Sequence, residues 1–370
     1  MNRQVVIVGA GLSGLRAASL LHKHGILCKV LEARDRIGGR VLSDSVASRL
    51  ELGKFDLGPT WFWPQYESAI ADLAIELNLG TFIQYTSGTI LLERSRNEAP
   101  EHFLLPDNAN PSSIRFTGGV QSLIDALANT IPPGTIDLGT RVTALRLDKN
   151  GLVTIEADLA DGGRKQFSAN TVILALPPRI VEQHIEFSPL LPPELTSDLV
   201  NKPTWMAGQA KAVVIYERPF WRETGLSGFA SSRVGPLQEI HDASPGSGAG
   251  ALFGFFGIPA KARYELGQDE LGQLVINQME RLFGPAALQA VDFLYKDWSE
   301  DSETAVEQDH YPLTNYPAYG RLLVDGEWEK KIIFAGTETD SQFGGHLEGA
   351  LRSAERAVSE INRWLRGGTH

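Results

Sequence analysis

Hydrophobic positions alternate between strand-like and helical spacing at both ends of the chain. The β-branched run Gln4–Val8 predicts a buried parallel strand. Apolar residues at 15, 17, 18, 20 and 21 predict a helix over Leu12–His24, which Gly25 would end. Leu27–Leu31 predicts a second strand, so the first three elements form a βαβ unit of about 30 residues.

Further along the chain, strand-like runs outnumber helical ones. Residues 119–130 predict a helix after two glycines, and Leu266–Phe283 has the spacing of an amphipathic helix. Near the C-terminus, Lys331–Ala335 predicts a strand and Glu348–Trp364 a helix. The other strand-like runs are Val142–Leu147, Leu152–Ala157, Thr171–Leu176, Ala210–Tyr216 and Ala251–Phe256.

Strand–helix units at both ends, with different material between them, predict an α/β fold (α+β overall) with two domains. A Rossmann-like nucleotide-binding domain would be assembled from the discontinuous segments 1–66, 112–195 and 325–370. A smaller substrate domain, with a mixed sheet and helices, would take 67–111 and 196–324. The length of 370 residues suits two such domains, with a core that needs no disulfide or metal.

Composition excludes several classes of function. A net charge of −11 makes the chain a poor general binder of nucleic acid or of an anionic membrane. The single cysteine, Cys28, cannot form an internal disulfide, and no Cys/His set has the spacing of a zinc site, so no metal is expected. No apolar stretch has the length of a membrane span and no targeting segment is evident, so we expect a cytoplasmic protein. Glycine is the outlier, with 37 residues, and its placement is therefore informative.

The first glycine cluster directly follows the first predicted strand. Gly9, Gly11 and Gly14 have the spacing Gly-x-Gly-x-x-Gly, which permits a tight turn, admits a pyrophosphate and lets helix and strand pack. The following helix would point its unpaired N–H groups at the pyrophosphate. Glu32 ends the second strand 18 residues after Gly14, where its carboxylate would bind a ribose diol and repel a 2′-phosphate. The unit therefore predicts a site for NAD or FAD rather than NADP.

The residues after Glu32 distinguish these two cofactors. The run from Glu32 to Arg40, in which Gly38 and Gly39 precede the arginine, resembles FAD proteins of the amine oxidase and carotenoid desaturase superfamily. The resemblance implies that Arg40 neutralises the pyrophosphate. The alternative is an arginine on a surface loop.

More motifs, in order along most of the chain, resemble the flavin-containing amine oxidases. This family includes monoamine oxidases, polyamine oxidases and L-amino acid oxidases. The resemblance implies FAD and, at the last motif, a helix whose N-terminus faces the flavin and stabilises negative charge on it. The motifs are Phe55–Thr60, Arg115–Gly119, Arg141-Val142, Tyr216–Trp221, Phe334–Thr339 and Leu347–Ala350.

The motifs together assign a set of cofactor-binding residues. They come from the βαβ unit, from the segment beside the flavin, from one central strand and from the C-terminal motif. The set is Gly9, Gly11, Ser13, Gly14, Glu32, Ala33, Arg34, Gly39, Arg40, Leu57, Gly58, Pro59, Thr60, Val142, Gly336, Glu338, His346, Leu347 and Ala350.

Three residues are expected to be catalytic. Lys261 follows the strand Ala251–Phe256, and the resemblance implies that it holds a water against flavin N5 and assists the reaction with oxygen. Trp298 matches a tryptophan that packs near the flavin in relatives. His346 would stand beside N5, where it could hydrogen-bond the substrate. The alternatives are a solvated lysine that opens a helix, a core tryptophan and a satisfied structural histidine.

The chain departs from its relatives in ways that bear on cofactor and substrate. Monoamine oxidases attach FAD through a cysteine, but Glu303–Tyr311 has none, so FAD should be non-covalent unless His310 is linked. Their two caging tyrosines are replaced, by His346 at one position and near Gln308 at the other. Trp61 stands where L-amino acid oxidases have a carboxylate-binding arginine, which disfavours α-amino acids. The residues expected to face a cationic or apolar amine are Trp61, Trp63, Gln308 and Phe255.

The segment between two of the motifs is short. Only about fifty residues separate Thr60 from Gly118, where relatives insert a long, mainly helical part of the substrate domain. We therefore expect an open active site, or a second subunit of a homo-oligomer that covers it.

The resulting hypothesis is FAD-dependent oxidation of the C–H bond beside an amine nitrogen. Flavin N5 takes the hydride, water hydrolyses the imine, and O2 reoxidises the flavin to give H2O2. The expected partners are a small amine and O2, without nucleic acid or membrane. The alternatives are an FAD-dependent C–C desaturase, an FAD-binding protein without turnover and an NAD-linked dehydrogenase. Lys261 would favour the oxidase over the first two.

Overall fold

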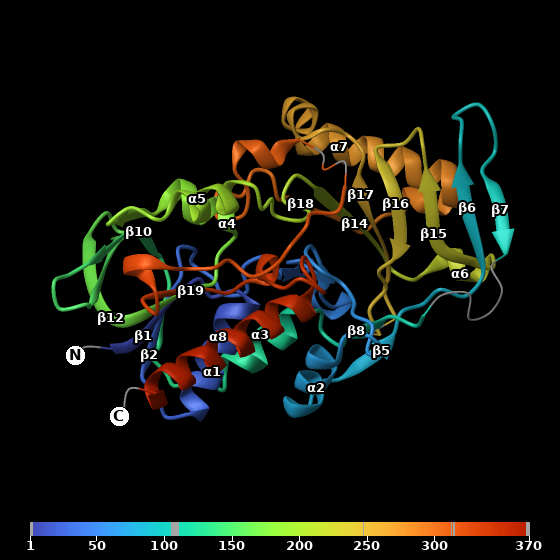
Figure 1. Ribbon diagram of the computed structural model, residues 1–370. Helices are drawn as coiled ribbons and strands as arrows, with labels where there is room; N and C mark the ends of the chain where they lie inside the picture. The colour runs from blue at the N-terminus through green and yellow to red at the C-terminus, as the bar shows by residue number, and fades with distance from the viewer. Residues whose placement is uncertain (1–2, 105–110, 247, 312, 314, 368–370) are drawn as a thin grey trace.

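The computed structural model describes residues 3–104, 111–246, 248–311, 313 and 315–367, in which two large sheets form two halves of the molecule. Figure 1 shows α1, α2, α3 and α8 along the lower half and α7 along the upper half. The fold is α/β with parallel and antiparallel sheets, as the sequence predicts. Among the described residues, no helix is long and apolar enough to cross a membrane.

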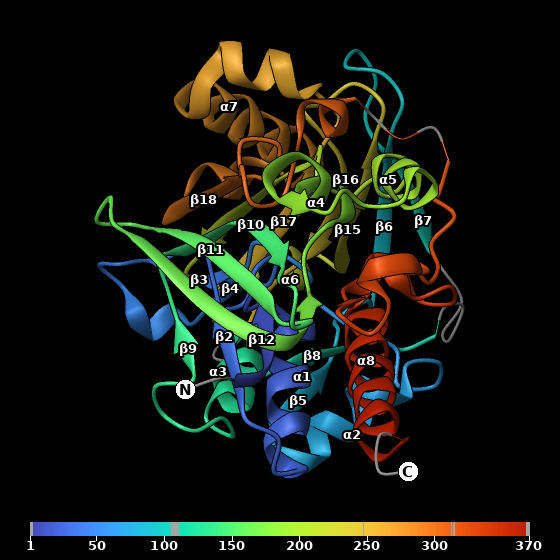
Figure 2. The ribbon, with the colours of Figure 1, turned by 60° about the vertical axis from the view of Figure 1, so that its left-hand side comes forward.

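The lower half is built on an eight-stranded sheet. Its centre is parallel: β1 pairs with β2 on one side and with β12 on the other, and β19 pairs with β12. The antiparallel pair β11 and β12 projects beyond this centre, as Figure 2 shows in green. The strands are β1 (Arg3–Val8), β2 (Cys28–Leu31), β9 (Ile136–Asp137), β10 (Thr140–Leu147), β11 (Val153–Leu159), β12 (Arg164–Leu174), β13 (Glu186–Ser188) and β19 (Ile332–Phe334).

Both faces of the central strands are buried, which is why Val5–Val8 of β1 form an uninterrupted β-branched run. Val5 and Ile7 pack in one core with the helices α1 (Leu12–Lys23), α3 (Gln121–Ala128) and α8 (Leu347–Gly367). Val6 and Val8 face the opposite core, which also contains residues of α4 (Pro178–His184) and α5 (Pro193–Val200).

The upper half is a seven-stranded sheet in the order β18-β14-β17-β16-β15-β6-β7. α7 (Ala260–Phe283), whose backbone is interrupted at Gly267, covers one face. The other face packs against the segment around Phe55 and Leu57. The strands are β6 (Thr89–Glu93), β7 (Glu101–Leu104), β14 (Ala210–Tyr216), β15 (Leu226–Ser232), β16 (Leu237–Asp242), β17 (Gly250–Phe256) and β18 (Asp292–Asp297).

The remaining α-helices and strands are short. They are the helices α2 and α6 and two small antiparallel pairs, β3 with β4 and β5 with β8. Their bounds are α2 (Ser68–Glu76), α6 (Phe220–Glu223), β3 (Ser43–Asp44), β4 (Phe55–Asp56), β5 (Thr81–Ile83) and β8 (Ile114–Phe116).

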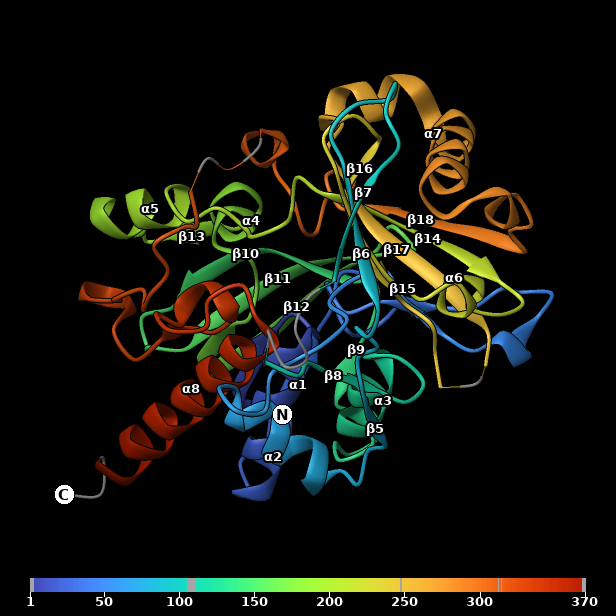
Figure 3. The same cartoon turned by 90° about the vertical axis from the view of Figure 1, so that its right-hand side faces the viewer.

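One helix lies apart from the rest of its predicted domain. The predicted division places 67–111 in the substrate domain, and β6 and β7 do belong to the upper sheet. α2 instead packs beside α8, as Figure 3 shows, and contributes Ile70 and Leu73 to the core of the lower half. Glu348, in the first turn of α8, also holds α2 in this place, because its carboxylate accepts hydrogen bonds from the backbone N–H groups of Ala69 and Ile70.

The glycine turn after β1 is packed too tightly for any side chain at its third glycine. A Cβ on Gly14 would lie 1.9 Å from the carbonyl oxygen of Gly9 and 3.4 Å from the side chain of Ala175. The helix α1 can therefore approach β1 this closely only because residue 14 is glycine.

Gly14→Ala should lower the free energy of unfolding by about 1–3 kcal/mol, because the helix must move away from the strand. Urea denaturation followed by circular dichroism would measure this loss. Gly272→Ala in α7 is the matched control, because a Cβ there would lie 3.5 Å from the ring of Phe293, an ordinary contact. That control should be neutral or stabilising. Equal behaviour of the two variants would contradict the tight packing.

Candidate active site

A cavity of about 340 Å³ lies between the two halves of the molecule. The glycine turn after β1 and residues 38–41 line one part of it, and residues 57–61 run past its middle. The start of α8 and the first residues of β14 also line it. The cavity is therefore assembled from segments that are far apart in the sequence.

At the nucleotide end, Glu32 is already held by the backbone. Its side chain is buried, and its carboxylate accepts hydrogen bonds from the N–H groups of Ala10 at 2.7 Å and Arg34 at 3.0 Å. Gly39 faces the turn so closely that a Cβ would lie 3.2 Å from Cα of Gly11. Two glycine backbones thus form a cradle with no side chain between them.

Arg40 is fixed at the cavity by a buried carboxylate. Its Nη1 lies 2.7 Å from Oε1 of Glu338, and its Nη2 donates to Oε2 at 3.2 Å. Burial lowers the pKa of Arg40, but the charge of Glu338 and the hydrogen bond to it prevail and raise that pKa above its usual value. Arg40 therefore presents a permanent positive charge to the cavity.

The sequence-predicted cofactor residues mostly meet at this cavity. Arg34 lines it and is held by Asp301 and by the hydroxyl of Thr304. Glu338 supports Arg40 from behind. The cavity-lining residues of the predicted set are Gly9, Gly11, Ser13, Glu32, Arg34, Gly39, Arg40, Leu57, Gly58, Pro59, Thr60, Gly336, His346, Leu347 and Ala350.

Three further members of the predicted set, Val142, Ala33 and Gly14, do not line the cavity. The side chain of Val142 packs in the core beneath β10, so this residue does not line the cavity. Ala33 does not line it either. Gly14 acts through the packing of α1 rather than through contact with the cavity.

The prediction that Lys261 reaches the cavity is wrong. Its side chain is 91% exposed in the first turn of α7, where its nearest ionic partner is Glu265 at 4.0 Å. The helix covers the face of the upper sheet that points away from the cavity, so a residue at its start cannot reach inside.

Lys211, in β14, is the lysine that lines the cavity. Its Nζ donates to the carbonyl oxygen of Gly58 at 3.0 Å and to Oγ1 of Thr60 at 2.6 Å. It also lies 3.9 Å from the ring centroid of Phe253. Burial lowers the pKa of Lys211 to about 7, although the charge of Asp56 acts in the opposite direction.

A signal for Lys211 is present in the sequence. All seven residues of β14 are buried, and Lys211 is the only charged residue among them. A lysine inside a continuous apolar strand is rarely tolerated unless it has a partner or a function. The sequence predicts the strand, and the charge within it marks Lys211 as a candidate functional residue.

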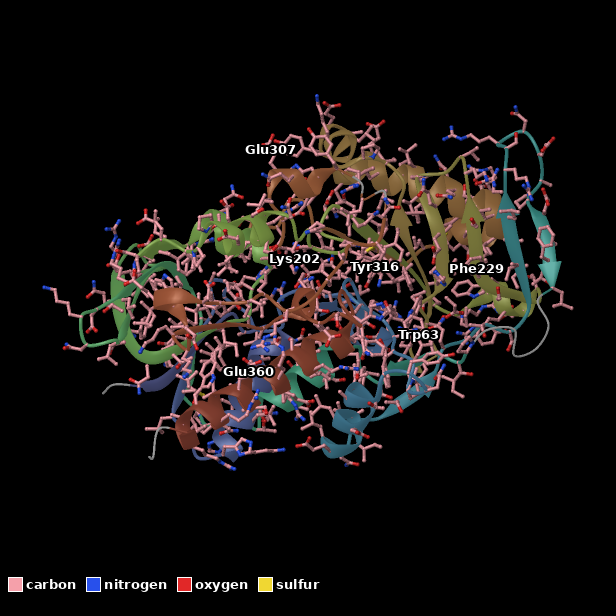
Figure 4. All side chains as sticks on the ribbon, viewed as in Figure 1. Trp63, Lys202, Phe229, Glu307, Tyr316 and Glu360 are labelled. Atoms are coloured by element: carbon pink, nitrogen blue, oxygen red, sulfur yellow. The ribbon has the colours of Figure 1, made fainter. Side chains whose placement is uncertain are left out.

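The predicted aromatic residues form one wall of the cavity. Trp61, Trp63 and Phe255 all line it, and Figure 4 shows Trp63 where the two halves meet. The ring of Trp63 lies 6.1 Å from that of His346. Glu67, which the sequence analysis missed, lines the same region, and its Oε1 lies 2.9 Å from Nδ1 of His346.

Trp298 lies at the cavity, whereas Gln308 does not. The indole N–H of Trp298 donates to the carbonyl oxygen of Leu57 at 3.0 Å, which ties its ring to the segment beside the cavity. Gln308 is exposed in a 3-10 turn, Glu307–His310, and Figure 4 shows Glu307 at the outer edge of the molecule. The prediction that Gln308 faces the substrate is therefore wrong, because the loop turns outward. Among the described residues, no cluster of His, Cys, Asp and Glu could hold a metal ion.

Comparisons with known proteins agree with this geometry. The family profile described as "Flavin containing amine oxidoreductase" matches residues 82–362. A profile described as "NAD(P)-binding Rossmann-like domain" matches residues 7–77. The chain is 28% identical, over 456 aligned positions, to the "Putative flavin-containing monoamine oxidase AofH" of Mycobacterium tuberculosis, covering 96% of each chain. It is 25% identical to "Amine oxidase [flavin-containing] B" of Homo sapiens, covering 96% of this chain and 85% of the relative.

Solved structures share the fold. A putrescine oxidase bound to putrescine aligns with a TM-score of 0.79 at 22% identity, covering 98% of this chain and 99% of that one. Cyclohexylamine oxidase from Brevibacterium oxydans IH-35A aligns with a TM-score of 0.80 at 18% identity, covering 99% and 100%. The alignment with the mycobacterial relative has 456 positions, against 370 residues here, so that relative has segments with no counterpart in this chain.

The burial of Lys211 predicts a specific pH dependence of stability. Between pH 7 and 10.5 the unfolded chain binds the lysine proton and the folded protein does not, so the free energy of unfolding rises with pH. Relative to that of Lys211→Met, the free energy of unfolding of the wild type should rise by at most about 1.4 kcal/mol per pH unit over this range. Urea denaturation at pH 7.5, 8.5 and 9.5 would measure it. The exposed Lys261→Met should show no such trend, and a flat difference for both variants would contradict the buried neutral lysine.

Proposed function

The chain belongs to the family of flavin-containing amine oxidoreductases, and we propose that its cavity holds FAD without a covalent bond. A small amine would be oxidised in this cavity, beside the aromatic wall. The protein is an FAD-dependent oxidoreductase that acts on amines. The observation that carries the proposal is one cavity, lined at one end by the glycine cradle and Arg40 and at the other by Lys211, Trp61 and Trp63.

The residues present fit FAD. The glycine cradle leaves room for a pyrophosphate beside the N-terminus of α1, and Arg40 supplies the opposite charge. Glu32 is placed to bind a ribose hydroxyl. At the other end, His346, Leu347 and Ala350 bring the N-terminus of α8 to the cavity, where its dipole favours negative charge on a flavin ring.

The positions of the cysteine and of His310 support a non-covalent cofactor. Cys28 is the single cysteine of the chain, and it is buried in β2 within the core beneath α1. His310, the alternative attachment point, lies outside the cavity lining, with its Nε2 3.0 Å from the carbonyl oxygen of Ser299. We therefore propose that neither residue is linked to the flavin.

When bound, FAD would supply the redox chemistry, as the two-electron acceptor for the C–H bond beside the amine nitrogen, with O2 as the proposed final acceptor. The protein positions the substrate and sets the charge around it. Lys211, held between Gly58 and Thr60, would hold a water at the cavity and assist the reaction with oxygen, the role first assigned to Lys261. Trp298 would fix one side of the ring through its bond to Leu57.

The substrate side favours a cation over a carboxylate. The faces of Trp61 and Trp63 attract cations, and Glu67 adds a negative charge to the same region. Trp61 cannot form the bidentate pair that would hold an α-carboxylate. We therefore propose a primary amine without a carboxylate as the substrate.

Two further points remain proposals. A second subunit could cover the open side, because the chain lacks segments that the mycobacterial relative has. The single cysteine favours the reducing cytoplasm as the location. The desaturase alternative is less favoured, because Lys211 is suited to an oxidase.

The amine substrate can be tested directly with the FAD-loaded protein. Butylamine, benzylamine, cyclohexylamine and putrescine would be mixed anaerobically with the enzyme while the visible flavin absorbance is followed. At least one should bleach the flavin, and with air it should yield equal amounts of carbonyl product and H2O2. L-Leucine and L-phenylalanine are the matched controls and should not bleach it. Bleaching by the amino acids alone, or by none of the amines, would contradict the proposal.

The role of Lys211 can be separated from substrate oxidation. Lys211→Met should slow the reaction of the reduced holoenzyme with O2 by about 10²-fold, because a positioned polar group is lost. Stopped-flow mixing with oxygenated buffer measures the rate. Lys261→Met is the matched control, because the side chain of Lys261 is exposed, and it should react with O2 at the wild-type rate. If the two variants react at the same rate, Lys211 does not assist oxygen.

A further inference from the structure

Two carboxylates meet at the aromatic end of the cavity, where the N-termini of α2 and α8 adjoin. Glu348 has a structural role, because its two carboxylate oxygens accept hydrogen bonds from the backbone N–H groups of Ala69 and Ile70. Glu67, just before α2, is the one that lines the cavity.

Glu67 fixes the orientation of His346. Its side chain is 4% exposed; Oε2 accepts the backbone N–H of Trp63 at 2.7 Å, and Oε1 lies 2.9 Å from Nδ1 of His346. An ionised carboxylate can only accept hydrogen bonds, so Nδ1 must carry a hydrogen. The neutral imidazole then has its lone pair on Nε2, which has no protein hydrogen-bond partner among the described residues.

The chemistry of amine oxidation requires such an acceptor. A hydride can leave the carbon only when the neighbouring nitrogen has a lone pair to form the imine. A primary alkylamine has a pKa close to that of lysine, about 10.4, so at pH 7 only about one molecule in 10³ is neutral. A cation that the aromatic wall attracts must therefore lose a proton before it reacts.

We propose that Glu67 and His346 form a proton-accepting pair that converts the bound ammonium substrate into the reactive neutral amine. The proton moves from the ammonium nitrogen to Nε2 of His346, and the resulting imidazolium is stabilised by the carboxylate of Glu67. The inference rests on the proposed amine substrate. His346 is the group that touches the substrate, and Glu67 is a positioning residue that acts through it.

Other charges near the pair do not replace it. From α8, Glu348 is held by the backbone of α2, and the positive charge of Arg352 acts on it. Across the cavity, Arg40 is paired with Glu338, and Lys211 is held by backbone and hydroxyl oxygens. The other carboxylates that line the cavity are Glu32 and Glu303. Glu32 is held at the nucleotide end, and Glu303 pairs with Arg141.

The test compares the pH dependence of flavin reduction in three variants. The probe is the panel amine that reduces the wild type fastest, mixed anaerobically by stopped flow between pH 7 and 10. His346→Gln and Glu67→Gln should reduce about 10²-fold more slowly than the wild type at pH 7. The ratio of the wild-type rate to the variant rate should fall to about threefold at pH 10, because much of the amine is already neutral there and needs no proton acceptor. Glu76→Gln, at the exposed end of the same helix α2, is the matched control and should follow the wild type throughout.

A second readout is independent of turnover. In Glu67→Gln the amide oxygen can still accept from Trp63, so the amide N–H₂ would face Nδ1 and move the imidazole hydrogen to Nε2. Nitrogen-15 NMR of histidine-labelled protein at alkaline pH should show this change of tautomer, with His346→Gln identifying the signal. The tautomer should be unchanged in Glu76→Gln.

The outcomes separate this inference from the proposed function. A deficit of equal size at pH 7 and 10, or no deficit, would overturn the proton-accepting pair while leaving amine oxidation in place. An unchanged tautomer in Glu67→Gln would overturn the positioning role of that residue. A wild type that no amine reduces would overturn both the pair and the proposed function.

Discussion

The buried ion pair between Arg40 and Glu338 joins the two ends of the chain at the cavity. Glu338 is fully buried, and a buried carboxylate that loses its partner typically costs 3–5 kcal/mol. Beside it, the N–H of Gly336 donates to the hydroxyls of Ser13 and Ser353. Because these contacts place the glycine turn against the C-terminal motif, the nucleotide end of the cavity depends on them. The geometry of the rest of the cavity then follows from how the upper sheet docks on this frame.

The alternation of side chains along β14 determines what the upper sheet presents. Ala212 and Val214 face the core beneath α7, whereas Val213 and Ile215 face the segment around Leu57. Lys211 falls on the same side as the second pair, because side chains repeat every two residues along a strand. Its cross-strand partner is Phe255, and both residues line the cavity. A single shift of register would have buried the lysine beneath α7 instead.

A site residue could be predicted where the pattern that identifies it lies within a short stretch of sequence, and could not where its position depends on tertiary packing. The glycine spacing, Glu32 and Arg40 lie within the first 40 residues, in the βαβ unit or directly after it, so a short stretch of sequence and its family resemblance were enough to predict their roles. The prediction for Lys261 rests on its flanking residues after a strand, but a position after a strand does not show which face of a sheet the next helix will cover. The prediction for Gln308 is wrong for a related reason. The direction of a loop depends on tertiary packing, such as the ion pair between Arg179 and Asp309 in this loop.

The pairing of Glu67 with His346 could not have been found from sequence spacing, because 279 residues separate them. The same separation has a consequence for synthesis. Arg40 leaves the ribosome 298 residues before Glu338, a delay of about 15–60 s at 5–20 residues per second. Throughout that interval Glu338 and Glu348 have not been synthesised, so the glycine turn, the βαβ unit and α2 lack the contacts that these residues make. The cavity can therefore form only after the last helix has been synthesised.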